Sequence, residues 1–351
     1  MQVVTPQLIQ GKKVLLRLDI DVPLGKSSIA NRQSSEDEGW EVVDDFRLKA
    51  GLPTLKLCLE HAKEVVIMGH IGRPKGKEVS DLSVAPIVDW LDDQGFGSYM
   101  ESGKLKILEN LRFEAGEESC DLGYAKDLSF LGEVYINEAF ASYHPAASTT
   151  ILPTLLPCFA GLRFVMEVEA LTKVRENSQK PLVAVIGGAK VEDKLPVVLA
   201  LSKITDKVLV GGKIAKELSV ISYQLSANVL VGELNEEGTD ITQETIEDWK
   251  KIIMDAKMIV WNGPVGKIES SELRKEELGS ARGTYELAKM ITESGAETIV
   301  GGGDTVGFLG QSGLSKKFSF VSTGGGAMLK FLETGTLPTI KALSYPIDTK
   351  G

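Results

Sequence analysis

Short apolar segments alternate with helical patterns along almost the whole chain, and this alternation is its strongest constraint on the fold. Apolar runs of strand length lie near residues 13–19, 64–69, 105–109, 133–137, 181–187, 207–211, 258–261, 297–301 and 318–322. Helical patterns fall between them, over 50–63, 84–93, 193–204, 241–256, 283–294 and 326–333. Parallel strands need long crossover connections, which are usually helices. The alternation therefore predicts an α/β protein with mostly parallel sheets.

The chain length of 351 residues predicts about two domains. The charged helical pattern over 166–181, which Pro181 is expected to stop, falls between two halves whose strands end in different chemistry. We interpret it as an interdomain helix, although a surface helix within one domain fits the pattern equally well. The polar segment 27–39 has no periodicity and is interpreted as a surface loop.

Polar and cationic side chains follow the strands of the first half. In open α/β sheets, ligands bind beyond the carboxyl ends of the strands. Guanidinium groups stay charged and match carboxylate and phosphate oxygens. Several of them at one sheet edge predict a site for a small anion. The candidates are Arg17, Asp19, Asp21, Arg47, His70, Arg73 and Arg112.

Glycines follow the strands of the second half. They allow the backbone N–H groups to approach a polyphosphate, although a single such turn can also be tight strand–helix geometry. The glycines are Gly187, Gly188, Gly263, Gly266, Gly301, Gly302, Gly303, Gly324, Gly325 and Gly326. Lys190 and Lys194 share a helix face near one turn, where they are either anion ligands or solvated lysines. Asp304 could hold Mg²⁺ on a nucleotide phosphate or cap a helix.

Composition limits the classes of partner. The formal net charge of −10 argues against general nucleic-acid affinity. No apolar stretch is long enough to cross a membrane, and no charged segment leads into an apolar run at the N-terminus. The pattern around Cys58 and Cys158 predicts buried thiols, which fits a reducing cytoplasm. We expect a cytoplasmic monomer that binds small molecules.

Eight motifs together resemble the phosphoglycerate kinase family. In order along the chain they are RLDIDVPL, MGHIGRPKG, LENLRFEAGEE, VYINEAF, VIGGAKVEDKL, VWNGPVG, VGGGDT and VSTGGGA. The resemblance covers nearly the whole chain and suggests a divergent member with a shortened second domain. It implies two Rossmann-like domains that face each other across a cleft. Residues 1–165 would form the 3-phosphoglycerate domain, with 337–351 returning to it, 166–180 the hinge helix, and 181–336 the nucleotide domain.

The resemblance implies reversible transfer of the acyl phosphate of 1,3-bisphosphoglycerate to Mg²⁺–ADP. Hinge closure would bring the substrates together. The residues matching catalytic positions are Arg47, Lys190, Gly302 and Gly325. Those matching the acid site are Asp19, Asp21, Arg47, His70, Arg73 and Arg112. Those matching the nucleotide site are Gly188, Lys190, Lys194, Gly212, Asn262, Glu269, Gly302, Gly303, Asp304 and Thr305, with Asp304 reaching Mg²⁺ through the nucleotide phosphates.

Several positions depart from the family pattern. Asp21 replaces an asparagine, Pro145 replaces a substrate-phosphate arginine, and Ala147 replaces a histidine. Arg73 and Arg112 are then expected to carry most of the substrate phosphate, with help from Arg17. Further departures are Lys213 in place of a glycine near the adenine, a shortened segment 213–258, and an inserted loop at 27–39. An abbreviated adenine pocket is expected.

Two other readings stay open. One is a divergent kinase of the same fold with another small carboxylate or phosphate acceptor, which the departures at Asp21 and Pro145 motivate. The other is a non-catalytic nucleotide-binding protein. The retained Arg47, Lys190 and Lys194 speak against the second reading, because a protein that only binds need not keep residues from both sides.

Overall fold

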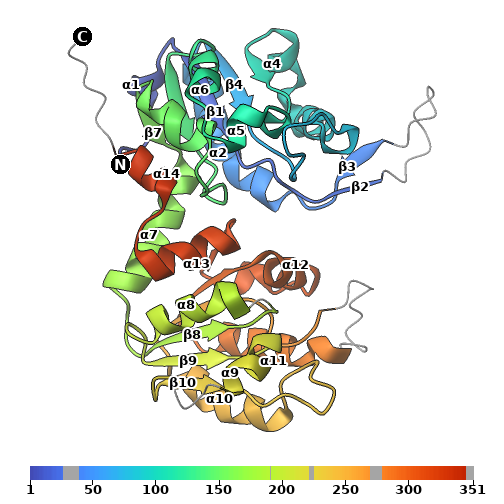
Figure 1. Cartoon of the computed structure of the whole chain (residues 1–351), viewed down its shortest axis with the longest axis vertical. Helices are drawn as coiled ribbons and strands as arrows, with labels where there is room; N and C mark the ends of the chain where they lie inside the picture. Colours follow the sequence, from blue (N-terminus) through green and yellow to red (C-terminus); the bar gives the residue numbers. More distant parts are fainter. Residues whose placement is uncertain (27–38, 190, 221–224, 269–278, 345–351) are drawn as a thin grey trace. The chain divides into compact units, whose positions relative to one another are not determined.

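The chain folds into two compact units, each built around a parallel sheet (Figure 1). The computed structural model describes residues 1–26, 39–189, 191–220, 225–268 and 279–344. Unit 1 combines Met1–Glu167 with the segment that begins at Leu337, and unit 2 is Val168–Thr336.

The sheet of unit 1 has five parallel strands in the order β5-β4-β1-β6-β7. They are β1 (Lys13–Arg17), β4 (Glu64–Met68), β5 (Leu105–Ile107), β6 (Val134–Asn137) and β7 (Cys158–Ala160). The register sets Leu15 of β1 beside Val66 of β4 and Tyr135 of β6. Helices cover both faces of such a sheet, so β1 and β4 are continuous apolar runs rather than alternating ones.

The helices of unit 1 pack on this sheet, and α2 and α3 share a core with β1 and β4. The α-helices are α1 (Pro6–Ile9), α2 (Phe46–His61), α3 (Ala85–Leu91), α4 (Gly97–Glu101), α5 (Ala115–Glu118), α6 (Leu122–Ser129) and α14 (Pro338–Ala342). Short turns are η1 (Ser80–Leu82), η2 (Asp92–Phe96), η3 (Leu111–Phe113), η4 (Ala147–Ile151) and η5 (Leu152–Thr154). The C-terminal α14 packs against η4, so the chain end returns to unit 1.

A hairpin that the sequence did not predict flanks the expected loop. Strands β2 (Leu24–Lys26) and β3 (Trp40–Val42) pair antiparallel, with Gly25 beside Glu41. The expected loop over 27–39 lies outside the described residues except for Gly39.

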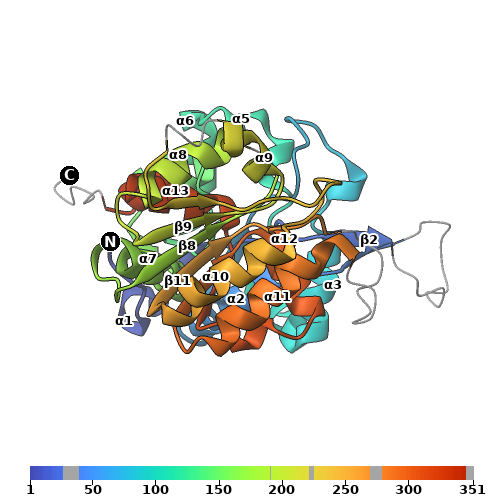
Figure 2. The same cartoon turned by 90° about the horizontal axis from the view of Figure 1, so that it is seen from below.

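The sheet of unit 2 has six parallel strands in the order β10-β9-β8-β11-β12-β13. They are β8 (Leu182–Ile186), β9 (Lys207–Val210), β10 (Val229–Val231), β11 (Met258–Asn262), β12 (Glu297–Gly301) and β13 (Phe320–Val321). The helices are α8 (Val191–Leu201), α9 (Lys213–Val220), α10 (Gln243–Asp255), α11 (Arg282–Glu293), α12 (Gly303–Gln311) and α13 (Gly325–Thr334), with short turns η7 (Gly279–Ala281) and η8 (Ser315–Lys317). Figure 2 shows α8 and α13 on one side of the strands and α10 and α11 on the other.

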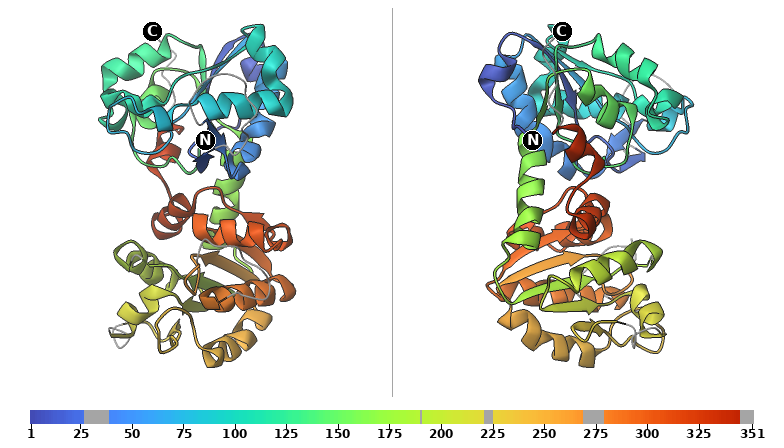
Figure 3. Two further views of the ribbon diagram at one scale, coloured as in Figure 1. Left: turned by 90° about the vertical axis from the view of Figure 1, so that its right-hand side faces the viewer. Right: turned by 60° about the vertical axis from the view of Figure 1, so that its left-hand side comes forward.

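Helix α7 (Leu162–Glu176) carries the chain from unit 1 to unit 2, and Figure 3 shows it as one continuous helix. It begins before and ends before the expected 166–181. Glu138, which follows β6, accepts hydrogen bonds from the first amides of α7, those of Arg163 and Phe164 at 3.1 Å each. This capping starts the helix early. The helix stops at Glu176, so the expectation that Pro181 ends it was wrong.

The cysteines are free, but only one is buried. Cys58 lies in the core of unit 1 as expected, whereas Cys158 is partly exposed, so the expectation of a buried thiol there was wrong. Cys158 begins the short strand β7 at the edge of the five-stranded sheet, where, within the described part of the chain, only an isolated bridge from Val3 to Ala160 lies on its outer side. Among the described residues, none of the helices combines the length and the apolar character needed to span a bilayer.

Candidate functional site

Both sheets reverse their strand order at a defined point, and the predicted site residues follow the strands at these points. In unit 1 the chain fills β1, β4 and β5 to one side and then crosses to β6 and β7. In unit 2 it fills β8, β9 and β10 before crossing to β11, β12 and β13. Ligands of open α/β sheets bind at such switch points, outside the carboxyl ends of the strands. Each unit therefore has one topologically favoured binding position.

The switch point of unit 1 gathers the predicted cations around His70, which follows β4. Burial, together with the positive charges of Arg17, Arg112, Arg47 and Arg73, lowers the pKa of His70 to about 2. The imidazole is therefore neutral at physiological pH. Arg47 comes from the start of α2, whereas Arg112 belongs to η3, which follows β5. The sequence prediction that these side chains share one sheet edge is met.

Asp19 is a buried carboxylate without a hydrogen-bond partner. Its side chain follows β1, and neither oxygen has a partner among the described residues. The pKa of Asp19 is raised to about 6, chiefly by burial; the charge of Arg47 opposes the rise and that of Asp21 adds to it. Oδ1 of Asp19 lies 3.9 Å from Nη1 of Arg47. An orphaned buried acceptor beside cations suits a ligand that brings a hydroxyl donor.

Asp21 is held by a backbone amide rather than by an arginine. Oδ1 of Asp21 accepts from the N–H of Gly72 at 2.9 Å, and Oδ2 lies 3.9 Å from Nε2 of His70. The backbone carbonyl of Asp21 accepts from Nη1 of Arg47 at 2.6 Å. Asp21 therefore fixes both the loop after β4 and the guanidinium of Arg47.

The arginines of the site differ in how much of their charge is available. Arg73 is exposed and has no partner among the described residues. Arg112 donates from Nη1 to the Gly72 carbonyl at 2.7 Å and pairs with Glu118 at 3.3 Å. Arg17 has an exposed fraction of only 1%. The expectation that Arg17 helps to bind the substrate phosphate was wrong, because burial and internal hydrogen bonds occupy its guanidinium.

Sequence reasoning missed the residues that occupy Arg17. Ser148, in η4, accepts from Nε of Arg17 at 3.1 Å and donates to Oε1 of Glu117 at 2.6 Å. Glu117 lies on α5 and is buried, whereas its neighbour Glu118 is exposed. The sequence carries no signal that separates these two glutamates, because α5 has a single turn and shows no usable periodicity.

In unit 2, the glycine turns after β8, β9 and β11 pack directly on one another. A Cβ on Gly212 would lie 2.8 Å from the N atom of Gly188, and one on Gly263 would lie 2.2 Å from the Gly187 carbonyl oxygen. Both residues also have positive φ, so glycine is required there by the fold itself. Gly188 also has a positive φ, but a Cβ there would meet only the end of Lys194, 3.9 Å away, so the space beside it is open.

Lys194 and Asn262 join two of these segments at the switch point of unit 2. Nζ of Lys194, from α8, donates to Oδ1 of Asn262, at the end of β11, at 2.6 Å. Nδ2 of Asn262 donates to the carbonyl of Gly325 at 3.2 Å. An ammonium is thereby fixed beside the glycine turns. The predicted site residues Lys190 and Glu269 lie outside the described residues.

The start of α12 is open toward its surroundings. Gly302 is the N-cap, and a Cβ on Gly303 would meet nothing within 4 Å. Asp304 lies in the first turn, is exposed, and has no partner in the described part of the chain. The alternative that Asp304 caps this helix was therefore wrong. Thr305 is buried, and its Oγ1 has no hydrogen-bond partner among the described residues.

The start of α13 packs against this segment. A Cβ on Gly325 would lie 2.5 Å from the Cα of Gly302, so Gly325 permits the close approach of the two turns. Together the turns present two helix N-termini at one sheet edge, an arrangement that favours anions.

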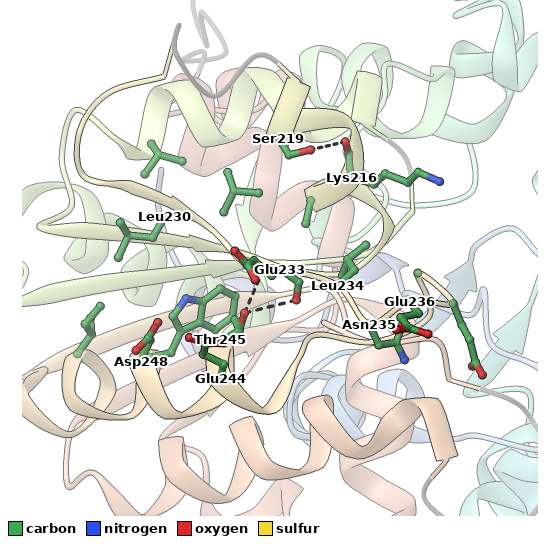
Figure 4. Close-up of a pocket in the computed structure, with 18 residues that line it drawn as sticks. Lys216, Ser219, Leu230, Glu233, Leu234, Asn235, Glu236, Glu244, Thr245 and Asp248 are labelled. Carbon is green, nitrogen blue, oxygen red and sulfur yellow. Dashed lines mark hydrogen bonds between the residues drawn. The ribbon is translucent and has the colours of Figure 1, made fainter.

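A cavity of about 860 Å³ lies between α9, α10 and the end of β10 (Figure 4). Its walls include the apolar Leu230 and Trp249. Thr245 also lines the cavity. Its hydroxyl accepts from the N–H of Glu233 at 3.0 Å and donates to the Glu233 carbonyl at 3.4 Å. Helix α9, which lines it, begins directly after Gly212. A cavity of this volume is large enough for a small ligand.

Comparison with known proteins gives a consistent family match. The family model of phosphoglycerate kinase matches residues 4–225 and 219–335. The phosphoglycerate kinase of Solibacter usitatus (strain Ellin6076) is 34% identical over 394 aligned positions, covering 95% of this chain and 97% of the relative. That of Salinibacter ruber is 34% identical over 401 positions, covering 96% and 97%.

The chain belongs to the phosphoglycerate kinase family. Solved phosphoglycerate kinases agree: that from Coxiella burnetii superposes with a TM-score of 0.76 at 29% identity, covering 96% of this chain and 97% of that chain. That from Pyrococcus horikoshii OT3 gives 0.78 at 28% identity, covering 98% of each. The 394-position alignment exceeds the 351 residues of this chain, so the relative carries segments that this chain lacks. Membership makes the chain a phosphotransferase that uses a nucleotide.

At the departure from the family pattern around Pro145, an aromatic pair lies near the arginines. The rings of Tyr143 and His144 have centroids 4.1 Å apart. Burial lowers the pKa of His144, and the charges of Arg112 and Arg73 lower it further, so His144 lies close to both. Pro145 thus leaves a neutral imidazole, rather than a further guanidinium, near the two arginines.

Proposed function

We propose that this phosphoglycerate kinase family member transfers the acyl phosphate of 1,3-bisphosphoglycerate to Mg²⁺–ADP, reversibly, giving 3-phosphoglycerate and ATP. One observation carries the proposal: the two switch points of one chain hold complementary chemistry. The first collects cations around His70 and includes Asp19, a buried carboxylate without a hydrogen-bond partner among the described residues, and the second collects glycine turns and a fixed lysine, Lys194.

In the acid site, we assign the exposed Arg73 and the half-committed Arg112 to the phosphate of 3-phosphoglycerate. Asp19 is assigned to the hydroxyl of the acid, because an ionised carboxylate can only accept hydrogen bonds. His70 is neutral and donates one hydrogen bond. Asp21 positions Arg47 and the loop at Gly72 and faces the acid with its second oxygen.

In the nucleotide site, we assign the phosphates to the turns at Gly188, Gly302 and Gly303 and to Lys194. The cavity beside α9 suits the nucleoside and not the phosphates, because most of its charged lining is acidic. The acidic residues are Glu233, Glu236, Glu237, Glu244 and Asp248, and Lys216 is the one cationic side chain of this lining. The phosphates should therefore point toward the glycine turns. Lys190 and Glu269 are assigned to the transferring phosphate and the ribose through the family resemblance.

Mg²⁺ enters with the nucleotide in this proposal. No cluster of three or more His, Cys, Asp or Glu side chains suited to a metal occurs among the described residues, so a complete protein cage is not the expected mode. The exposed, partnerless carboxylate of Asp304 fits a single contact to a phosphate-bound Mg²⁺. The ion would neutralise phosphate charge.

The chemistry asked of the protein is positioning and charge stabilisation. A transferring phosphoryl group carries negative charge on three oxygens and needs little covalent help. Arg47 is available for this task because, within the described part of the chain, only its Nη1 is engaged, by the Asp21 carbonyl and near Asp19. The chemistry requires no general base, which agrees with the pKa of His70, about 2, because such an imidazole does not take up a proton near neutral pH.

One specific observation favours the alternative hypothesis of a kinase with another small acceptor. Beside Pro145, the neutral imidazole of His144 lies where the family resemblance implies a guanidinium. We further propose a cytoplasmic monomer, which the three free thiols support.

A coupled assay with Mg²⁺–ATP and a panel of acids tests the proposal. We expect turnover with 3-phosphoglycerate and at least a hundredfold lower kcat/KM with 2-phosphoglycerate, glycerate and acetate. A better acid than 3-phosphoglycerate would favour the divergent kinase. Nucleotide binding without turnover of any acid would favour the non-catalytic protein.

A further inference from the structure

The side chain of His70 is held at its far nitrogen by a buried arginine. Nη2 of Arg17 lies 2.6 Å from Nδ1 of His70. A guanidinium has donors only, so Nδ1 must accept this hydrogen bond. The neutral ring therefore carries its proton on Nε2. Nε2 lies 3.9 Å from Asp21, beyond hydrogen-bond distance, so its N–H is available to a ligand.

Arg17 is itself fixed by two further acceptors. Nη1 donates to the carbonyl of Leu18 at 2.8 Å, and Nε donates to Oγ of Ser148 at 3.1 Å. With Nη2 on His70, the guanidinium is held on three sides. It cannot rotate away from His70 without breaking the other two bonds.

Ser148 is fixed in turn by Glu117. Its backbone N–H donates to Oε2 at 2.9 Å, and its hydroxyl donates to Oε1 at 2.6 Å. Because the hydroxyl proton is committed to Glu117, the Ser148 oxygen can only accept from Arg17. The exposed fractions of Glu117, Ser148 and Arg17 are 1%, 0% and 1%. Each hydrogen bond in the series from Glu117 through Ser148 and Arg17 to His70 therefore has one possible direction.

We propose that Glu117, Ser148 and Arg17 are positioning residues that hold His70 as the Nε2–H tautomer, making the imidazole a fixed hydrogen-bond donor to the acid substrate. The inference rests on the proposed function for the identity of the acid. The other tautomer would present the Nε2 lone pair to an anion and repel it. This series of hydrogen bonds runs from α5 through η4 to the ends of β1 and β4.

Nitrogen-15 NMR of the ring nitrogens tests the tautomer directly in the full chain. The protein has three histidines, His61, His70 and His144, and a His70→Gln variant assigns the signal. The expected result is a neutral His70 with the proton on Nε2 at about pH 7. A proton on Nδ1 in the parent overturns the inference, whether or not any variant folds.

Kinetics then separate positioning from a purely structural role. Ser148→Ala removes the hydroxyl that accepts from Nε of Arg17. Glu117→Gln removes the carboxylate that fixes the direction of the Ser148 hydroxyl. Both should mix the His70 tautomers and raise KM for 3-phosphoglycerate about tenfold, the effect of one lost hydrogen bond, with kcat and KM for ATP within about twofold. The matched control is Glu114→Gln, an exposed glutamate beside α5, which should change neither readout.

Two outcomes would overturn the role. One is a pure Nε2–H tautomer in Ser148→Ala with KM unchanged, and the other is a tautomer change without any effect on KM. The inference and the proposed function fail separately. An active parent with the proton on Nδ1 overturns this inference alone, and an inactive parent with Nε2–H counts against the proposed function alone.

Discussion

Nη1 of Arg47 lies 3.9 Å from Oδ1 of Asp19 and donates to the backbone carbonyl of Asp21 at 2.6 Å. One nitrogen of the guanidinium thus lies against the strand end, near an unsatisfied carboxylate. The fork is oriented before any substrate arrives. Preorganised charge of this kind acts on the transition state, because the protein need not reorganise when charge develops.

Replacement of Arg47 by alanine should therefore lower kcat for phosphoryl transfer by roughly a hundredfold to a thousandfold. Nucleotide affinity should change little, because Arg47 belongs to unit 1. Steady-state kinetics and nucleotide calorimetry measure the two effects, and Lys49→Ala, an exposed change two residues on, is the control. An effect confined to KM for the acid would show that Arg47 only anchors substrate.

Asp19 should make stability depend on pH in a specific direction. Burial raises its pKa from 3.8 to about 6, so the folded state disfavours the ionised carboxylate. Stability conferred by the protonated form is present below the unfolded pKa and is lost as pH rises through about 6. The asparagine side chain of Asp19→Asn cannot ionise. Above this pH the free energy of unfolding of the variant should therefore exceed that of the parent by up to about 3 kcal/mol.

Urea unfolding between about pH 5 and pH 8 measures this difference, which should grow with pH and level off. Asp127→Asn, at an exposed position of unit 1, should show no such trend. A stability difference between Asp19→Asn and the parent that stays constant across the range would contradict the assigned cause.

Asp21→Asn should tighten binding of 3-phosphoglycerate. The amide oxygen can keep the hydrogen bond from Gly72, while the negative charge near the acid disappears and a donor replaces an acceptor. Partly exposed charges at such distances interact by roughly 1 kcal/mol, so a gain of about fivefold is expected. Calorimetry decides, and equal or weaker binding would mean that the carboxylate is already accommodated.

Lys194→Ala should weaken nucleotide binding by at least about tenfold, since it removes a charged hydrogen bond to a phosphate. The change also frees Asn262, so Lys194→Met provides a second variant that preserves much of the packing. Lys203→Ala, an exposed lysine just beyond α8, is the control. Unchanged affinity for ADP in both Lys194 variants would place the phosphates elsewhere.

Asp304→Asn should weaken binding of Mg²⁺–ADP and leave binding of metal-free ADP almost unchanged. Asp304 is not the N-cap of α12 and has no described partner, so its replacement should cost at most a few tenths of a kcal/mol in unfolding free energy. The Tm should therefore fall by no more than about 1 °C. Titration with and without Mg²⁺ measures the difference. An equal loss under both conditions would remove Asp304 from the metal contact.

The inner strands of both sheets could be predicted from the sequence because buried parallel strands are continuous apolar runs. The runs near 64–69 and 297–301 correspond to β4 and β12. Strands β7 and β10 were missed, whereas the equally short edge strand β5 was predicted from the apolar run at 105–109, so strand length alone does not decide which strands can be found. The extent of α7 was also missed, since the capping group Glu138 is distant in sequence.

The candidate site divides in the same way. Residues at strand ends, such as His70 and Asn262, could be predicted because topology alone places them at one edge. Glu117 and Ser148 could not, because their role depends on burial and on hydrogen bonds between distant segments. The wrong expectation for Arg17 has the same origin, since a strand-end arginine is indistinguishable by sequence from a buried one.

The most direct test of phosphoryl transfer to a carboxylate is trapping of the acyl phosphate with hydroxylamine. Purified protein, 3-phosphoglycerate and Mg²⁺–ATP should give a hydroxamate together with ADP, with both substrates required. Arg47→Ala and Lys194→Ala should abolish most of the signal, while Lys49→Ala and Lys203→Ala should retain it. Release of ADP without hydroxamate, or full hydroxamate formation in Arg47→Ala, would contradict the account.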